Sequence, residues 1–108
     1  MTQVYSYIPN LLAQNGEIPA GSILSPTIYG DAQLKAILFT FAEGQELSEH
    51  TSTQTAILHF LQGEAEVTLG NETMAAQPGT WVRMAPRLPH SIVAKTPVIM
   101  LLLMFKGA

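Results

Sequence analysis

The sequence contains no cysteine and few charged residues. Without cysteine, the 108-residue chain has no disulfide scaffold and no thiolate chemistry. Charged residues make up 12% of the chain, against about 25% in ordinary soluble domains, and the formal net charge is −3. A chain with so few charges has less surface that must stay in contact with water. We therefore expect another subunit to cover part of it, as in a homodimer.

Long apolar runs and basic clusters are also missing. The longest apolar run, residues 98–105, spans eight residues, whereas a membrane helix needs about 20. The basic residues are scattered at Lys35, Arg83, Arg87, Lys95 and Lys106. No group of them can follow a phosphate backbone. The first five residues lack the basic start and the apolar stretch of a signal peptide. We therefore expect a cytoplasmic protein that binds neither membranes nor nucleic acids.

What the sequence does contain is a series of short β-prone segments separated by Gly, Pro and Asn, with 47% hydrophobic residues to build a core. This spacing is typical of a β-sandwich or barrel, and the length favours one domain over residues 1–108. The expected strands are residues 22–29, 34–42, 55–61, 64–69, 73–77, 80–84, 91–95 and 98–105, with one short helical turn at 10–14. Pro26 removes a ladder donor, so it places the first strand at an edge or a bulge.

The last expected strand, residues 98–105, is apolar on both faces. Its odd-numbered residues are Ile, Leu, Leu and Phe, and its even-numbered residues are Val, Met, Leu and Met. One face of an antiparallel sheet is usually solvated, so this strand should be covered on both sides. The cover is either the N-terminal segment folded over it or a second copy of the chain, and we favour the second copy.

Two segments each combine a turn glycine, a β-patterned stretch and a histidine. The first begins at Gly44, reaches His50 six residues later and ends at Gly63. The second begins at Gly79 and reaches His90 eleven residues later. A hairpin of suitable length separates the two segments, so we expect His50 and His90 to meet at one opening of the barrel.

These segments resemble the two motifs of the cupin superfamily, at about residues 44–63 and 79–94. The first cupin motif has a second histidine and a glutamate, and these positions hold Ser52 and Ala56. The second motif matches also at Pro86, while its internal glycine is Arg87 and its terminal asparagine is Ala94. The resemblance implies a small single-domain cupin with an all-β fold, a double-stranded β-helix or jelly-roll barrel of the RmlC-like kind.

The resemblance also implies the metal site of the family, in which three histidines and one glutamate hold Fe, Mn, Ni or Zn. This chain keeps His50 and His90 at ligand positions and has no ligand of that kind at Ser52 or Ala56. Gln54 has the parity of His50 on a regular strand, and its amide oxygen is a neutral ligand for a hard cation. Two alternatives stay open: a weak, water-rich metal site at His50, His90 and Gln54, or two histidines that hydrogen-bond in a pocket without a metal.

Other side chains near the motifs also have two interpretations each. His59 is expected on the outer face, but a bulge that shifts the register by one residue would turn it toward the other two histidines. Trp81 is either a flat wall of the pocket or plain core. Arg83 and Arg87 either pair with an anionic substrate or stay solvated. The expected pocket residues are His50, Ser52, Gln54, Trp81 and His90.

Three functions from different classes remain. The leading one is a small-molecule-binding cupin with its pocket near His50 and His90, acting as a sensor, a carrier or a metal-free enzyme. In the last case one histidine would serve as general base. The first alternative is a metal-dependent cupin enzyme, either a dioxygenase or a sugar or keto-acid isomerase. The second alternative is a structural or regulatory homodimer without turnover.

Overall fold

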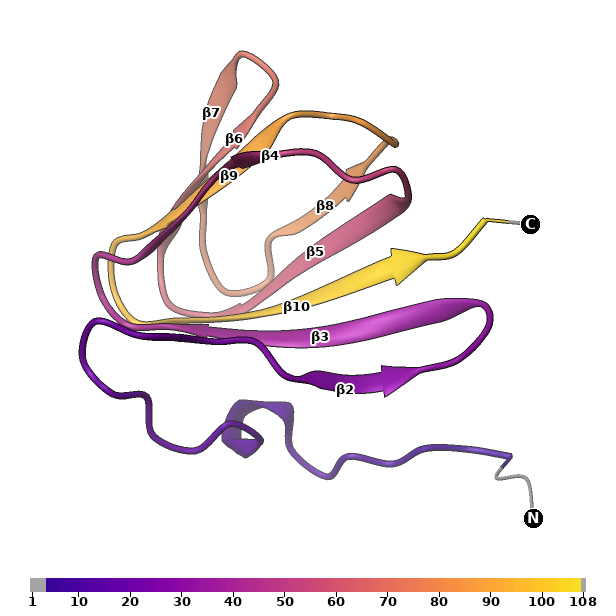
Figure 1. Cartoon of the computed structure of the whole chain (residues 1–108). Helices are drawn as coiled ribbons and strands as arrows, with labels where there is room; N and C mark the ends of the chain where they lie inside the picture. The colour runs from indigo at the N-terminus through magenta and orange to yellow at the C-terminus, as the bar shows by residue number, and fades with distance from the viewer. Residues whose placement is uncertain (1–3, 108) are drawn as a thin grey trace.

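The computed structural model describes residues 4–107 as two antiparallel β-sheets that face each other (Figure 1). Sheet A has the strand order β1-β3-β10-β5-β8, with β2 also paired to β3, and sheet B has the order β4-β9-β6-β7. This is the jelly-roll barrel that the sequence predicts. Residues 1–3, part of the stretch in which no signal peptide is expected, lie outside the described range.

The described residues form ten strands and one short 3-10 turn. The bounds are η1 Leu11–Ala13, β1 Ile23–Leu24, β2 Thr27–Gly30, β3 Leu34–Phe41, β4 Glu46–His50, β5 Thr55–Gln62, β6 Ala65–Leu69, β7 Glu72–Ala76, β8 Trp81–Met84, β9 His90–Ala94 and β10 Val98–Phe105. The described part of the chain holds no helix with the length and apolarity needed to span a bilayer.

The first expected strand is interrupted at its proline. Residues 23–24 form β1 and residues 27–30 form β2, and both pair with β3. The register shifts within β2, and the Pro26 carbonyl accepts a hydrogen bond from the Leu38 N–H at 3.1 Å. The expected edge position and the expected bulge are therefore both present, because a proline nitrogen cannot donate to the ladder.

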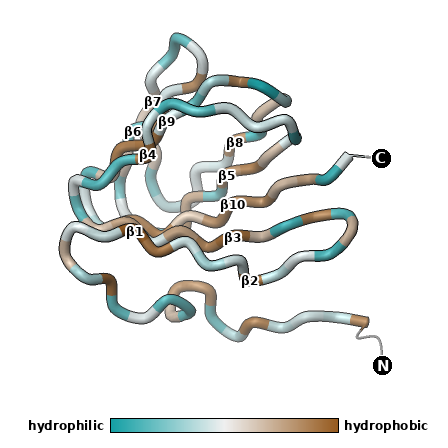
Figure 2. Tube along the Cα trace, in the orientation of Figure 1, coloured by the Kyte–Doolittle hydropathy of each residue, from teal (hydrophilic) through white to brown (hydrophobic). Residues whose placement is uncertain are grey.

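The core lies between the two sheets and follows the two-residue period of the strands. In β5, Ala56, Leu58 and Phe60 point inward and are almost fully buried. Figure 2 shows hydrophobic residues along β3, β10 and β5, the central strands of sheet A. The core cluster consists of Phe41, Ala56, Leu58, Phe60, Ala65, Val67, Ala76, Met84, Ile92, Ala94, Val98 and Met100.

The outer face of sheet A is covered only in part. The N-terminal segment runs along β2 and β3 (Figure 1), where Ala36, Leu38 and Thr40 are buried. The Asn15 side-chain amide fastens this segment by donating to the Leu38 carbonyl at 3.0 Å and to Thr40 Oγ1 at 2.8 Å. Farther across the same face, Trp81 remains 58% exposed. On the outer face, β10 therefore has the N-terminal segment on the side of β3 and an open surface on the side of β5 and β8.

Candidate functional site

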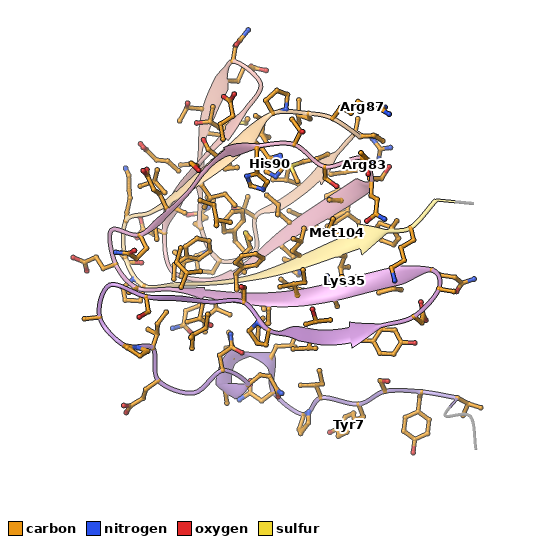
Figure 3. All side chains as sticks on the ribbon, viewed as in Figure 1. Tyr7, Lys35, Arg83, Arg87, His90 and Met104 are labelled. Carbon is orange, nitrogen blue, oxygen red and sulfur yellow. The ribbon has the colours of Figure 1, made fainter. Side chains whose placement is uncertain are left out.

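Two histidines from the two motif segments meet where sheet B opens. His50 ends β4 and His90 begins β9, and the two residues are register partners in adjacent strands. The register shifts between Leu47 and His50, so the His50 side chain follows a different alternation from the rest of β4. The ring centroids lie 4.1 Å apart, with 57° between the ring planes. Figure 3 shows the His90 ring in the space between the two sheets.

The backbone assigns the tautomer of each ring. His50 Nδ1 lies 2.8 Å from the Ser48 carbonyl oxygen, and His90 Nδ1 lies 2.9 Å from the Leu88 carbonyl oxygen. A carbonyl oxygen only accepts hydrogen bonds, so each Nδ1 carries a proton and donates it. In the neutral ring each Nε2 therefore keeps a free lone pair. Within residues 4–107 neither Nε2 has a hydrogen-bond partner.

Burial keeps His90 in its neutral form. The side chain is 6% exposed, and this burial lowers the pKa of His90 below the ordinary value of 6.5, because desolvation disfavours the charged ring. The neighbouring His50 lowers the pKa further, while the bond to the Leu88 carbonyl opposes the change. Near pH 7 His90 is thus neutral, and its Nε2 accepts hydrogen bonds or binds a cation.

The two rings open on a cavity of about 470 Å³ between the sheets. This volume is within the range of small-molecule sites, about 300–1,000 Å³. The rim is polar because the loop between β4 and β5 contributes hydroxyl groups, and the floor is apolar because sheet A contributes its inward-facing residues. The lining residues are His50, Thr51, Ser52, Thr53, Ala56, Met84, His90, Leu102 and Met104.

Ser52 and Arg87 hold two loops together at the rim. The Ser52 carbonyl accepts a hydrogen bond from the Arg87 N–H at 2.6 Å, and Ser52 Oγ accepts one from the Gln54 N–H at 3.1 Å. Arg87 has φ of 68°, the only positive φ of a non-glycine residue within residues 4–107. This position is the internal glycine of the second cupin motif, so the backbone keeps the glycine-like conformation although the side chain is arginine.

The two sheets, the paired histidines and the cavity agree with a comparison against known families, in which the model of the Cupin domain matches residues 37–105. The chain belongs to the cupin family. This cupin is similar in structure to a cupin superfamily protein from Desulfitobacterium hafniense DCB-2, with 24% identity and a TM-score of 0.85, over 95% of this chain and 94% of that one.

Two further solved structures have the same fold. A conserved protein of unknown function from Streptococcus pyogenes is 29% identical, with a TM-score of 0.84, over 96% of this cupin and 90% of that chain. An RmlC-like cupin from Shewanella frigidimarina is 17% identical, with a TM-score of 0.78, over 98% of this cupin and 93% of that chain. None of the curated proteins matches this sequence. These likenesses establish the fold.

Three of the residues expected in the pocket line the cavity of this cupin, and two do not. His50, Ser52 and His90 are lining residues, whereas Gln54 and Trp81 are not. Gln54 fails to follow the parity of His50 because residues 51–54 form a loop instead of a regular strand. Trp81 lies on the outer face, beside its register partner His59 of β5, because the alternation of β8 turns the neighbouring Val82 inward.

The third histidine of this cupin lies outside the barrel. His59 is the register partner of Trp81 on one side and of Leu101 on the other, and its neighbour Leu58 is 1% exposed in the core. The alternation of β5 is regular here, so the one-residue slip that would turn His59 inward does not occur. A site of three histidines is thereby excluded.

The donor set does not fit the four-ligand divalent site that the family resemblance implies. Residues 4–107 contain no group of three or more His, Cys, Asp or Glu residues placed to hold a metal ion. Ser52 and Ala56 stand where the second histidine and the glutamate are expected, and no carboxylate lines the cavity. Two neutral imidazoles alone supply half of the ligands and none of the negative charge. We therefore derive no catalytic step through a divalent ion.

Sequence reasoning misses more than half of the cavity wall. Thr51 and Thr53 come from a loop where the parity argument assumes a strand, and Met84, Leu102 and Met104 come from sheet A. The alternation within residues 98–105 does place Leu102 and Met104 on one face together. It does not say which face is inside, because both faces of that strand are apolar.

Proposed function

We propose that this cupin binds a small molecule in the cavity beside His50 and His90. The observation that carries the proposal is the pair of adjacent imidazoles whose Nδ1 atoms are held by backbone carbonyls, so that two Nε2 lone pairs open on one cavity. Such a pair accepts hydrogen bonds and donates none from those atoms. The complementary ligand presents hydroxyl or amine donors to the two rings.

The rest of the wall limits the ligand further. The floor contains Ala56, Leu102 and two methionines, so the part of the ligand that lies deepest is apolar. The rim offers the hydroxyl groups of Thr51, Ser52 and Thr53, which both donate and accept. The volume of about 470 Å³ suits a compact molecule with a polar end and an apolar end.

The same geometry suits proton abstraction from the bound molecule. A neutral imidazole with a free Nε2 is a general base, and the depressed pKa of His90 keeps it in that form near neutral pH. Turnover by a metal-free cupin is therefore part of the proposal as a second step after binding. It requires an acidic C–H or O–H of the ligand within hydrogen-bond reach of Nε2.

The test is the thermal stability of metal-free protein with a panel of small polyols, amines and carboxylates of matched size. We expect hydroxyl- or amine-bearing members to raise the melting temperature by several degrees, since a ligand that binds only the folded state stabilises it. His50→Ala and His90→Ala should lose this response, whereas His59→Ala on the outer face should keep it. A response that survives in both pocket variants would contradict the proposal.

We also propose that a second copy of the chain covers the outer face of sheet A. The chain exposes 6737 Å², against about 5,900 Å² expected for a compact monomer of its mass. Trp81, 58% exposed, lies on this face with the partly buried Leu101 and Leu103 of β10. An exposed tryptophan on the same face as partly buried aliphatic side chains is typical of a protein–protein interface.

A further inference from the structure

Two methionines face the histidine pair from the opposite sheet. In sheet A the register joins Met104 of β10 to Ala56 of β5, and Ala56 to Met84 of β8. Register partners share a face, so all three side chains point to the same side of the sheet, the side that lines the cavity. Neighbouring strands lie about 4.8 Å apart, so the two methionine Cα atoms are separated by about 10 Å.

The small residue between the methionines leaves them room to converge. Ala56 stands where the cupin motif has a glutamate, and its methyl group does not fill the space over the middle strand. The flexible side chains of Met84 and Met104 lie on either side of that space, and both contact the same cavity as His50 and His90. Figure 3 shows Met104 on sheet A facing the side of the barrel that holds His90.

The cavity therefore collects four neutral donors of a particular kind. Two are imidazole nitrogens with free lone pairs, and two are thioether sulfurs. No carboxylate and no thiolate lines the wall. Hard divalent ions such as Mn²⁺ prefer oxygen ligands, often carboxylates, whereas thioether ligands select Cu(I) and imidazole is also a good copper ligand. A monovalent ion also loses less hydration energy on burial among neutral ligands than a divalent ion does.

We propose that the cavity is a Cu(I) site, with His50 Nε2 and His90 Nε2 as nitrogen ligands and the sulfur atoms of Met84 and Met104 as thioether ligands. The proposal uses the cavity of the proposed function but does not depend on which small molecule enters it. The loss of the cupin glutamate and the presence of two methionines beside its position then have one explanation. The hard, charged glutamate is lost, and soft, neutral thioethers stand beside its position.

The experiment is an anaerobic titration of tag-free, metal-free protein with Cu(I), in competition with a chromophoric Cu(I) chelator. Fe(II), Mn(II), Ni(II) and Zn(II) are titrated in parallel. We expect about one Cu(I) per chain, bound at least roughly tenfold more tightly than any of the divalent ions. X-ray absorption at the copper edge should report both nitrogen and sulfur neighbours.

Matched variants identify the ligands. Met84→Leu and Met104→Leu keep the volume of the side chain and remove the sulfur, and each should weaken Cu(I) binding by about tenfold or more. His50→Ala and His90→Ala should abolish it. The controls are Met74→Leu on β7, where the methionine is 41% exposed, and His59→Ala on the outer face. Both controls should bind Cu(I) as the parent protein does.

Several results would overturn the copper site. Binding of less than about a tenth of an equivalent of Cu(I), tighter binding of a divalent ion, or absorption data without sulfur neighbours would each do so. Unchanged affinity in both methionine variants would do so as well. Melting temperatures of the metal-free variants check that they fold, and the absorption data on the parent protein decide the question even if a variant does not fold. The thermal-shift test of small-molecule binding is made without metal. Its result therefore supports or contradicts the proposed function independently of the result for Cu(I).

Discussion

Arg87 combines a charged side chain with a backbone conformation that favours glycine. Its φ of 68° lies in the left-handed region, and its N–H holds the Ser52 carbonyl at the rim of the cavity. A non-glycine residue in this region costs about 1–2 kcal/mol. Since cupins have glycine at this motif position, the arginine adds strain at the rim of the cavity.

The strain predicts an order of stability among variants of Arg87. Arg87→Gly should be more stable than Arg87→Ala by about 1 kcal/mol, because glycine adopts positive φ freely and alanine does not. Chemical denaturation of the two variants measures the difference directly. The comparison with alanine controls for loss of the arginine side chain. Equal stability of the two would mean that the backbone here is not left-handed.

His90 makes the stability of the fold depend on pH. Its pKa in the folded protein is lowered by burial first and by His50 second, relative to 6.5 in the unfolded chain. Above pH 6.5 the ring is neutral in both states and its contribution is complete. As the pH falls from 6.5 through the lower folded pKa, the unfolded chain takes up the proton first, so stability decreases.

Denaturation between pH 5 and 8 tests this prediction. One proton gives a slope of at most about 1.4 kcal/mol per pH unit in the affected window. His90→Gln should flatten the decrease below pH 6.5, whereas His59→Gln on the outer face should leave it in place. A decrease of the same size in His90→Gln would assign it to another group.

At the scale of single residues, the motifs predict His50 and His90 as site residues, and the structure brings these two rings together. They are predictable because their spacing from Gly44 and Gly79 is a local property of the chain. Met84 and Met104 are not predictable as cavity residues, since their role depends on the pairing of β8, β5 and β10.

At the scale of elements, the hairpin between β5 and β6 depends on Gly63. This residue has φ of 85°, and a Cβ atom added there would lie 1.9 Å from the Pro97 carbonyl oxygen. The neighbouring Glu64 N–H is held by Thr96 Oγ1 at 2.9 Å, so the loop before β10 packs closely against the hairpin. The glycine of the first motif is thus required by the approach of a second backbone segment as well as by its own turn.

Gly63→Ala should therefore destabilise the protein by about 3 kcal/mol or more, because the backbone of one loop must move. Gly79→Ala is the control: its φ is 97°, yet nothing lies within 4 Å of an added Cβ. That variant should show only the conformational cost, about 1–2 kcal/mol. Urea unfolding of both proteins is the measurement. If the two variants lost similar amounts of unfolding free energy, the contact with Pro97 would not contribute to stability.

Strand positions are predicted well because β-prone runs and turn residues are read directly along the chain. The loop between β4 and β5 is not predicted. The parity argument continues the strand that carries His50 through residues 51–54, which assigns Gln54 to the cavity and leaves Thr51 and Thr53 out. The register shift after Leu47 and the irregular loop depend on how sheet B meets sheet A, and alternation alone does not encode them.

At the scale of the whole molecule, the open outer face of sheet A predicts self-association. If a second copy covers it, Trp81→Lys should weaken the dimer by about 2 kcal/mol or more, since a tryptophan at an interface centre often contributes that much. Met74→Lys, which changes an exposed methionine on sheet B, should leave the dimer intact. Light scattering at micromolar concentration measures both. A parent protein with the mass of one chain would contradict this assembly.

Two imidazoles from separate motifs present bare Nε2 atoms to one cavity, and every role proposed for the cavity depends on them. Long-range ¹H–¹⁵N spectra of histidine-labelled, metal-free protein at about pH 8 test this arrangement most directly, because they report which ring nitrogen carries the proton. The backbone bonds to Ser48 and Leu88 predict that both His50 and His90 carry their proton on Nδ1. A proton on Nε2 of either ring would contradict the ligand class, the general-base step and the Cu(I) site together.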